Sequence, residues 1–207
     1  MKIDVNKELK EGCTLSEGES WEEHFKDFAK ELMNNHCIKV GSDEYHFLEL
    51  EFYYYDDKEH KDDDVNSKVY PRICKAEQLF VHYSGFDIAF ESIVEGESLT
   101  RFGGILVRGL FNAQTKEVIG GPLRCLMEVF NNQKGKPKFG KRKKSEKCVK
   151  IVDTKRIGIK SSEKYRFVRE DYWDKEKFTF TMKRCVYDNR KPVYKDKSYT
   201  YKFNQEG

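Results

Sequence analysis

The residues with the clearest chemical potential lie on one predicted strand, Tyr45 to Tyr55. Side chains of a strand alternate between its two faces, so Glu49, Glu51 and Tyr53 share one face. At a rise of about 3.3 Å per residue, the two carboxyl groups would lie roughly 6–7 Å apart. A carboxylate among aromatic rings tends to have a raised pKa, which suits it to take a proton from water near neutral pH. This face is the first candidate for a hydrolytic site.

The same alternation assigns the other face of this strand to the core. Ionised carboxylates on a half-buried strand are costly unless they are paired, solvated or used, so the carboxylate face borders a cleft or meets basic partners. Tyrosines on it would offer flat rings for stacking a planar base, as Tyr83 would further along the chain. The predicted core face is His46, Leu48, Leu50, Phe52 and Tyr54, and the carboxylate face also holds Tyr45, Phe47 and Tyr55.

Two other charged residues belong to this candidate site. The run 103–110 has the apolar composition of a central strand but contains Arg108, and an arginine there usually answers a carboxylate. We therefore expect Arg108 to form a structural ion pair with one of the strand glutamates. Asp87 follows a hinge at Gly85 within residues 78–91, and we expect it to face the same cleft as Glu51.

Two segments carry opposite charge. The acidic one directly follows the predicted strand 45–55, and the basic one lies in the second half of the chain. Residues 56–64 hold six acids, two lysines and His60, whereas residues 134–147 hold eight Lys or Arg and one Glu. The acidic run lacks the order and the glycine of a calcium loop, so we predict a solvated loop without metal. The basic run, with Lys141, Arg142, Lys143 and Lys144, is predicted to be a flexible loop over 133–147 that neutralises phosphates.

Local patterns predict the elements that position these residues. Ser20 and Glu23 form a capping box that predicts a helix over 21–34, and Pro122 is placed at the first turn of a second helix. Residues 92–102 read as a loop. The predicted strands cover 37–40, 45–55, 78–91 and 103–110, together with several segments of the last sixty residues.

Length and composition bound the architecture. The chain has 207 residues with 15 Phe, 12 Tyr and 2 Trp, enough for an aromatic-rich core in one domain. We expect a loose leader over residues 1–19 and a single domain over 20–207. Six cysteines without a C-x-x-C pair, and the lack of signal-peptide and membrane-span patterns, predict a cytoplasmic protein with reduced thiols and no contact with a membrane.

The order of these motifs resembles that of the alkyladenine (methylpurine) DNA glycosylase family over about residues 25–170. The resemblance implies an α+β fold, a single domain with a curved antiparallel sheet or partial barrel and a few flanking helices. It also implies a monomeric, monofunctional glycosylase that needs no cofactor and no metal. The segments that carry it are 28–32, 48–53, the acidic stretch to His60, 79–85, 104–109, 121–122, 156–159 and 165–168.

The same resemblance implies roles for single residues. Glu51 takes the position of the water-activating glutamate, and Tyr53 that of the tyrosine that stacks on a flipped base. The implied partner is a DNA duplex with a damaged base. The other positions are His60 and His82 at the walls of the base pocket, Tyr83 or Ser84 at the wedge that enters the duplex, and Arg108 on the strand below the site.

Three functions stay open at this stage. The first is excision of a damaged purine in DNA base excision repair with Glu51 as general base, and the second is a non-enzymatic module that binds nucleic acid through 134–147. The third is an enzyme for another ligand, built from Glu49, Glu51, His60, Asp87 and Arg108 around a small molecule or metal. A basic rim around Glu51 would favour DNA, an acidic rim the third function, and a Glu51 buried against Arg108 without a cavity would be structural.

Overall fold

The computed structural model describes residues 3–62, 72–130, 135–142, 148–157, 159, 163–173, 179–188 and 191–200. The chain divides into two compact units, Met1–Asp171 and Tyr172–Gly207. The second unit holds an antiparallel pair, β11 (Thr179–Asp188) and β12 (Lys191–Thr200). All residues predicted to form the site belong to the first unit. No helix in the described part of the chain is long and apolar enough to cross a bilayer.

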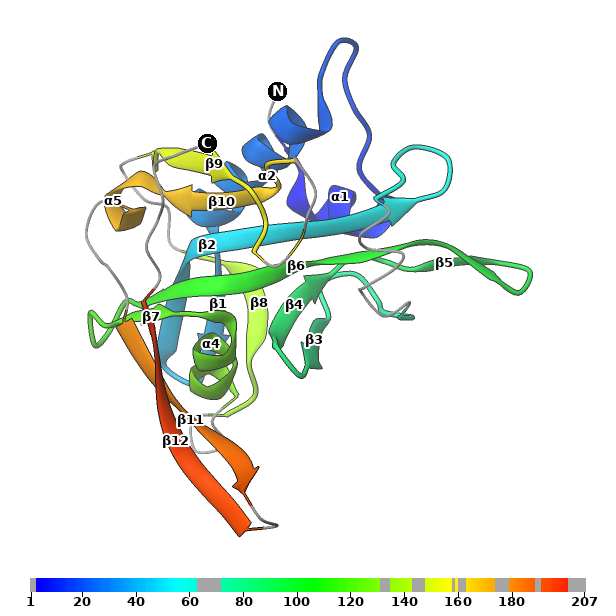
Figure 1. The fold of residues 1–207 in the computed structure, drawn as a ribbon. Helices are drawn as coiled ribbons and strands as arrows, with labels where there is room; N and C mark the ends of the chain where they lie inside the picture. The colour runs from blue at the N-terminus through cyan, green and yellow to red at the C-terminus, as the bar shows by residue number, and fades with distance from the viewer. Residues whose placement is uncertain are drawn as a thin grey trace. The chain divides into compact units, whose positions relative to one another are not determined.

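The first unit is built on a 10-stranded antiparallel sheet that curls into a half-barrel (Figure 1). Its main path runs β3-β4-β6-β2-β1-β8, while β10 pairs with both β2 and β9, and β5 and β7 pair with β6. The predicted α+β fold with a curved antiparallel sheet is therefore confirmed. The strands are β1 (His36–Val40), β2 (Asp43–Asp56), β3 (Leu79–His82), β4 (Gly85–Ala89), β5 (Ile93–Glu95), β6 (Ser98–Asn112), β7 (Val118–Gly120), β8 (Lys138–Lys141), β9 (Ile151–Thr154) and β10 (Arg166–Arg169).

Two of the helices begin where the sequence predicts. In α2 (Trp21–Asn35) both hydrogen bonds of the Ser20–Glu23 capping box are present, so the backbone N–H groups of Ser20 and Glu23 are satisfied. In α4 (Pro122–Val129) proline occupies the first turn, where its missing N–H costs nothing. The α2 helix buries Phe25, Phe28 and Leu32 in the main core of the sheet. The other described helices are α1 (Val5–Glu11) and α5 (Glu170–Trp173).

A β-bulge in β2 changes which residues face the core. The register with β6 shifts between Phe47 and Glu49 and again between Glu49 and Leu50. An extra residue reverses the alternation beyond it, so Tyr45 and Phe47 lie in the main core on the same side as Leu50. The prediction that Tyr45 and Phe47 share the carboxylate face is therefore wrong, whereas Glu49, Glu51 and Tyr53 keep a common face.

Residues 3–13 are ordered against the core and are not the loose leader that the sequence predicts. Asp4 caps α1, and the helix buries Val5 and Leu9 in the main core. The Arg101 guanidinium donates to the carbonyls of Lys10 and Glu11 and so holds the end of α1. A helix cap, two buried apolar side chains and the hydrogen bonds from Arg101 therefore order a segment whose composition is polar.

Two predicted loops contain strands. Residues 93–95 form β5 and pair with the start of β6, so much of the predicted loop 92–102 is a hairpin. Lys138–Lys141 form β8 on the edge beside β1, inside the segment predicted to be flexible. Backbone pairing with a neighbouring strand decides both cases, and polar side chains on an exposed strand give little sign of it. Lys143 and Lys144 lie outside the described residues.

Candidate active site

Neighbouring strands bring several of the polar residues predicted for the site, but not His60, to one face of the sheet. Glu51 pairs with Leu106 on β6, and Leu106 pairs with Asp87 on β4. Directly opposed residues of antiparallel strands share a face, so Glu51 and Asp87 point to the same side. Two strand spacings of about 4.8 Å separate their backbones by about 10 Å. Arg166 on β10 pairs with Glu51 from the other side and completes the row.

Glu51 is held by two different neighbours. The Tyr53 hydroxyl donates a hydrogen bond to Glu51 Oε1, and Arg108 Nη1 lies 3.2 Å from Oε2. Within the described residues, Oε2 accepts no hydrogen bond, and the residue is 0% exposed. Burial raises the pKa of Glu51, while the charge of Arg108 and the hydrogen bond from Tyr53 act in the opposite direction. The carboxyl group is thus fully buried against Arg108, an arrangement that a structural ion pair also shows.

Glu49 lies on the same face of β2 as Glu51 and pairs with the same arginine, Arg108, and with Arg166. Its Oε1 atom accepts from Arg108 Nε at 2.9 Å and from Arg166 Nε at 2.7 Å. The predicted ion pair between Arg108 and a strand glutamate is confirmed, and Arg108 in fact spans both acids. Two acids and two arginines therefore balance each other at this point of the sheet.

The guanidinium group of Arg156 lies over the ring of Tyr53. The Arg156 guanidinium carbon lies 5.2 Å from the centroid of the Tyr53 ring, within the range of a cation–π interaction. Arg156 is fixed there by Asp62, whose two carboxylate oxygens accept from it at 2.5 and 3.2 Å. Burial raises the pKa of the Tyr53 hydroxyl, so it stays protonated and donates to Glu51.

His60 lies on the opposite face of β2 from Tyr53. Its ring stacks on Trp21 at a centroid distance of 4.4 Å and on Tyr54 at 6.2 Å. Tyr54 belongs to the main core, and adjacent residues of a strand point to opposite faces. The structure therefore does not bring His60 and Tyr53 together as two walls of a base pocket, because the bridge between Asp56 and His60 folds His60 back toward α2.

The β3–β4 hairpin carries three polar residues predicted for the site. His82 Nε2 lies 3.1 Å from Asp87 Oδ1, and the Ser84 hydroxyl lies 2.9 Å from His82 Nδ1. The Ser84 backbone N–H donates to Nδ1 at 3.4 Å, so Nδ1 is an acceptor. Nε2 therefore carries the hydrogen and donates it in the hydrogen bond to Asp87. At the turn, Tyr83 is 84% exposed. Ser84 is thus turned inward and Tyr83 outward.

Arg72 is a member of the site that the sequence did not indicate. It forms an ion pair with Asp87, and its guanidinium carbon lies 4.5 Å from the Phe80 ring centroid. It fits because Gly104 has no side chain: a Cβ atom there would lie 2.4 Å from Arg72 Nη2. Gly104 is opposite Tyr53 in the sheet, so the Arg72 guanidinium lies over the strand position next to Tyr53.

The charges of this face are balanced. Each of its arginines is at most 8% exposed, and each acid is at most 5% exposed. The rim around Glu51 is therefore neither basic nor acidic, and every acid is paired with an arginine. The sequence had placed Arg156 and Arg166 in strand-like segments without assigning them a role. The arginines are Arg72, Arg108, Arg156 and Arg166, and the acids are Glu49, Glu51, Asp62 and Asp87.

The described basic residues of the predicted DNA-backbone segment lie away from Glu51. Strand β1 separates β8 from β2. Arg142 Nη1 donates to the Met33 carbonyl at 3.0 Å and so caps the end of α2. Lys141 is exposed and lines a pocket of about 360 Å³.

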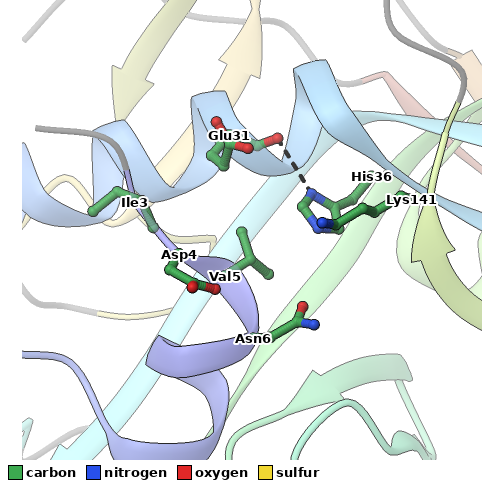
Figure 2. Close-up of a pocket in the computed structure, with 7 residues that line it drawn as sticks. All are labelled: Ile3, Asp4, Val5, Asn6, Glu31, His36 and Lys141. Atoms are coloured by element: carbon green, nitrogen blue, oxygen red, sulfur yellow. Dashed lines mark hydrogen bonds between the residues drawn. The ribbon is translucent and has the colours of Figure 1, made fainter.

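That pocket lies between the start of α1, the end of α2 and the first residue of β1 (Figure 2). His36 Nδ1 faces the Glu31 carbonyl at 3.5 Å, and His36 Nε2 has no hydrogen-bond partner among the described residues. Burial lowers the pKa of His36 and favours the neutral ring. Apart from Lys141, none of the residues predicted for the site lines this pocket. Its lining is Ile3, Asp4, Val5, Asn6, Glu31, His36 and Lys141.

The polar face of the sheet is poorly suited to a metal ion. Its four carboxylates each meet an arginine, which would compete with a cation for the same oxygens. A cluster with ligand geometry lies elsewhere, at Glu8, Cys13 and His24. No protein-family model, curated protein or solved structure compared with the chain gives a significant match.

Proposed function

We propose that the protein hydrolyses the N-glycosidic bond of a damaged purine flipped out of a DNA duplex, with Glu51 as general base. The observation that carries the proposal is the carboxylate of Glu51. Tyr53 fixes Oε1, whereas Oε2 faces Arg108 at 3.2 Å and accepts no hydrogen bond among the described residues. Burial raises the pKa of Glu51, which favours proton transfer near neutral pH.

In this mechanism water binds at Glu51 Oε2 and gives its proton to the carboxylate while its oxygen attacks the anomeric carbon. The bonding electrons of the glycosidic bond leave with the purine. Tyr53 lies two residues along on the same face of β2, within stacking reach of the base. The reaction uses no metal and no cofactor.

Base binding requires a movement of buried side chains. Glu51 is 0% exposed, and Arg72 occupies the space beside Tyr53. A flipped base stacks on Tyr53 once the Arg72 guanidinium moves away from Gly104. Asp87 loses its ion pair with Arg72 in this movement but keeps its hydrogen bond with His82. Tyr83 supports the same function, because an exposed aromatic at a hairpin tip is suited to enter the gap that the flipped base leaves.

The proposal includes a cytoplasmic protein that acts on DNA as a monomer. Five cysteines in the described residues are free thiols, the state that a reducing compartment maintains. Lys141 on the β8 edge is available to a phosphate, and Arg142 is engaged with the end of α2.

A base-release assay tests the proposal. Wild-type protein is incubated in excess over duplexes that each contain one alkylated or deaminated purine, and free base is measured. We expect release from at least one duplex, and Glu51→Gln should slow it by roughly 100- to 10,000-fold, the usual contribution of a general base, without weakening DNA binding. Glu59→Gln, on an exposed turn of the same chain, is the matched control and should keep the wild-type rate. Absence of release from every duplex by wild-type protein overturns the proposal.

One observation favours a second function, a nucleic-acid-binding module without catalysis. The full burial of Glu51 inside a balanced network of two acids and two arginines is also what a structural ion pair requires. This function predicts salt-sensitive DNA binding that Lys141→Ala weakens. The slope of the logarithm of the binding constant against the logarithm of the salt concentration should become shallower by about 0.9 for each lost phosphate contact. It predicts no base release, and Glu51→Gln would change stability alone.

A further inference from the structure

A second cluster of reactive side chains lies far along the chain from the sheet face, between α1 and α2. Glu8 on α1, Cys13 just beyond it and His24 on α2 each offer one ligand atom, and these atoms lie within 4.8 Å of one another. His24 Nε2 is 3.1 Å from Glu8 Oε2. His24 is 0% exposed and Cys13 is 3% exposed. The spacing contains no C-x-x-C or His-pair motif, so no sequence pattern predicts the cluster.

The turn that carries Cys13 is fixed from several sides. The Cys13 backbone N–H donates to the Tyr54 hydroxyl at 3.1 Å. Gly12 ends α1 with φ at 93°, a conformation that favours glycine, and any Cβ there would lie 2.4 Å from Arg101 Nη1. Arg101 donates to the carbonyls of Lys10 and Glu11. These contacts direct a thiol toward a carboxylate and an imidazole, where an apolar neighbour would suit an idle buried cysteine better.

A second acidic residue faces the histidine from the other side of its ring. Glu19 Oε1 lies 3.4 Å from His24 Nδ1, while Nε2 points to Glu8. Nδ1 makes no hydrogen bond in the described residues, so Glu19 is the acid that faces it at ion-pair distance. A carboxylate behind the second ring nitrogen is the usual arrangement around a metal-binding histidine, because it fixes the ring and raises its basicity.

The geometry points to a zinc site formed by Glu8, Cys13 and His24, with Glu19 behind the histidine. Sulfur and imidazole donors select zinc over calcium or magnesium, which prefer oxygen ligands. Zinc holds oxygen and nitrogen ligands at about 2.0–2.2 Å, so two tetrahedral neighbours lie about 3.3 Å apart, close to the Glu8–His24 separation. Three protein ligands leave a fourth position for water. The ion would join α1 to α2 and is independent of the proposed base excision.

The charges of the site favour one divalent ion. Glu8 and Glu19 both face the same buried ring, and buried charges need a partner or a metal. When zinc binds, the Cys13 thiol loses its proton to solvent, and the lone pairs of the thiolate sulfur and of the neutral imidazole nitrogen form the new bonds.

Metal titration of the full chain tests the site. Purified protein stripped with chelator is titrated with Zn²⁺ by calorimetry and with Co²⁺ by absorption, because a cobalt–thiolate bond gives a charge-transfer band in the near ultraviolet. We expect one Zn²⁺ and one Co²⁺ per chain, with that band present. Cys13→Ser should abolish the band and lower the affinity by more than about 100-fold, whereas Cys148→Ser, which removes an exposed thiol, should change neither.

Glu19→Gln keeps the inference testable if Cys13→Ser does not fold. It leaves all three ligands in place, and its side chain is partly exposed. Loss of the carboxylate behind His24 should lower zinc affinity by about 10- to 100-fold while the cobalt band persists. Absence of saturable metal binding by wild-type protein, or a cobalt band that survives in Cys13→Ser, overturns the zinc site.

Discussion

Arg108 joins Glu49 and Glu51 across two strands of the sheet. Its Nε lies 2.9 Å from Glu49 Oε1, and its Nη1 lies 3.2 Å from Glu51 Oε2. One guanidinium thus orients both acids, since its donors sit in a rigid planar fork. Glu49 accepts hydrogen bonds from two arginines, Arg108 and Arg166, whereas Glu51 accepts one from Tyr53 and none at Oε2 among the described residues. The proposed catalytic carboxylate is therefore the one that keeps an oxygen without a hydrogen-bond donor.

Arg108→Met should destabilise the fold strongly. The substitution removes the Arg108 guanidinium from both buried acids, Glu49 and Glu51, and breaking a buried pair in this way costs about 3–5 kcal/mol. Urea denaturation followed by circular dichroism measures the free energy of unfolding. Arg169→Met is the matched control, because its partner Asp171 is exposed and the pair should contribute at most about 1 kcal/mol. Equal losses in the two variants would contradict a special role for Arg108.

The raised pKa of Glu51 predicts a dependence of stability on pH. The folded state holds the Glu51 proton more tightly than the unfolded state because the group is buried. The resulting stability is fully present below the ordinary Glu pKa of about 4.3 and is lost as pH rises through the folded value. Glu51→Gln removes this titration. Its unfolding free energy relative to wild type should therefore increase between about pH 4 and pH 7, as measured by urea denaturation. A difference that stays constant with pH would contradict the burial argument.

Local patterns were enough to predict the elements that frame the site. The Ser20–Glu23 capping box places the start of α2, and Pro122 places the start of α4, because each acts within a few residues. The ion pair of Arg108 was also predictable, since an arginine inside an apolar strand must find an acid. Strand alternation also predicts the common face of Glu51 and Tyr53, whereas the separate roles proposed for them come from the resemblance to the glycosylase family.

Long-range geometry accounts for what the sequence did not reveal. The bulge that turns Tyr45 and Phe47 into the core adds one residue to β2 and leaves no trace in composition. Arg72 reaches Asp87 only because β4 and β6 are neighbours and Gly104 leaves room. His60 was assigned by its place in a resembling motif, and its ring packs against Trp21 because the chain turns back after Asp56.

Gly104→Ala should destabilise the protein and disturb the site. A Cβ atom would lie 2.4 Å from Arg72 Nη2 and 2.7 Å from Asp87 Cβ, so the ion pair or the strand must shift. Overpacking of this kind costs about 1–3 kcal/mol. Gly140→Ala is the control, because nothing lies within 4 Å of its Cβ position, and it should change stability by less than about 0.5 kcal/mol. Thermal and urea denaturation would compare the two, and equal stabilities would show that Arg72 does not need the space over Gly104.

Tyr83→Ala should slow base release from duplex DNA without affecting the hydrolysis step at Glu51. Tyr83 is 84% exposed, so its removal should leave the free energy of unfolding within about 0.5 kcal/mol of wild type. Loss of base stacking at the hairpin tip should lower single-turnover base release from duplex DNA by about 10- to 100-fold, corresponding to the usual stacking energy per base. Release from single-stranded DNA should stay unchanged, because no gap in a duplex has to be filled. Met127→Ala, another exposed apolar side chain at 69%, should affect neither substrate. An equal loss on both substrates would place Tyr83 in the base pocket instead of in the duplex.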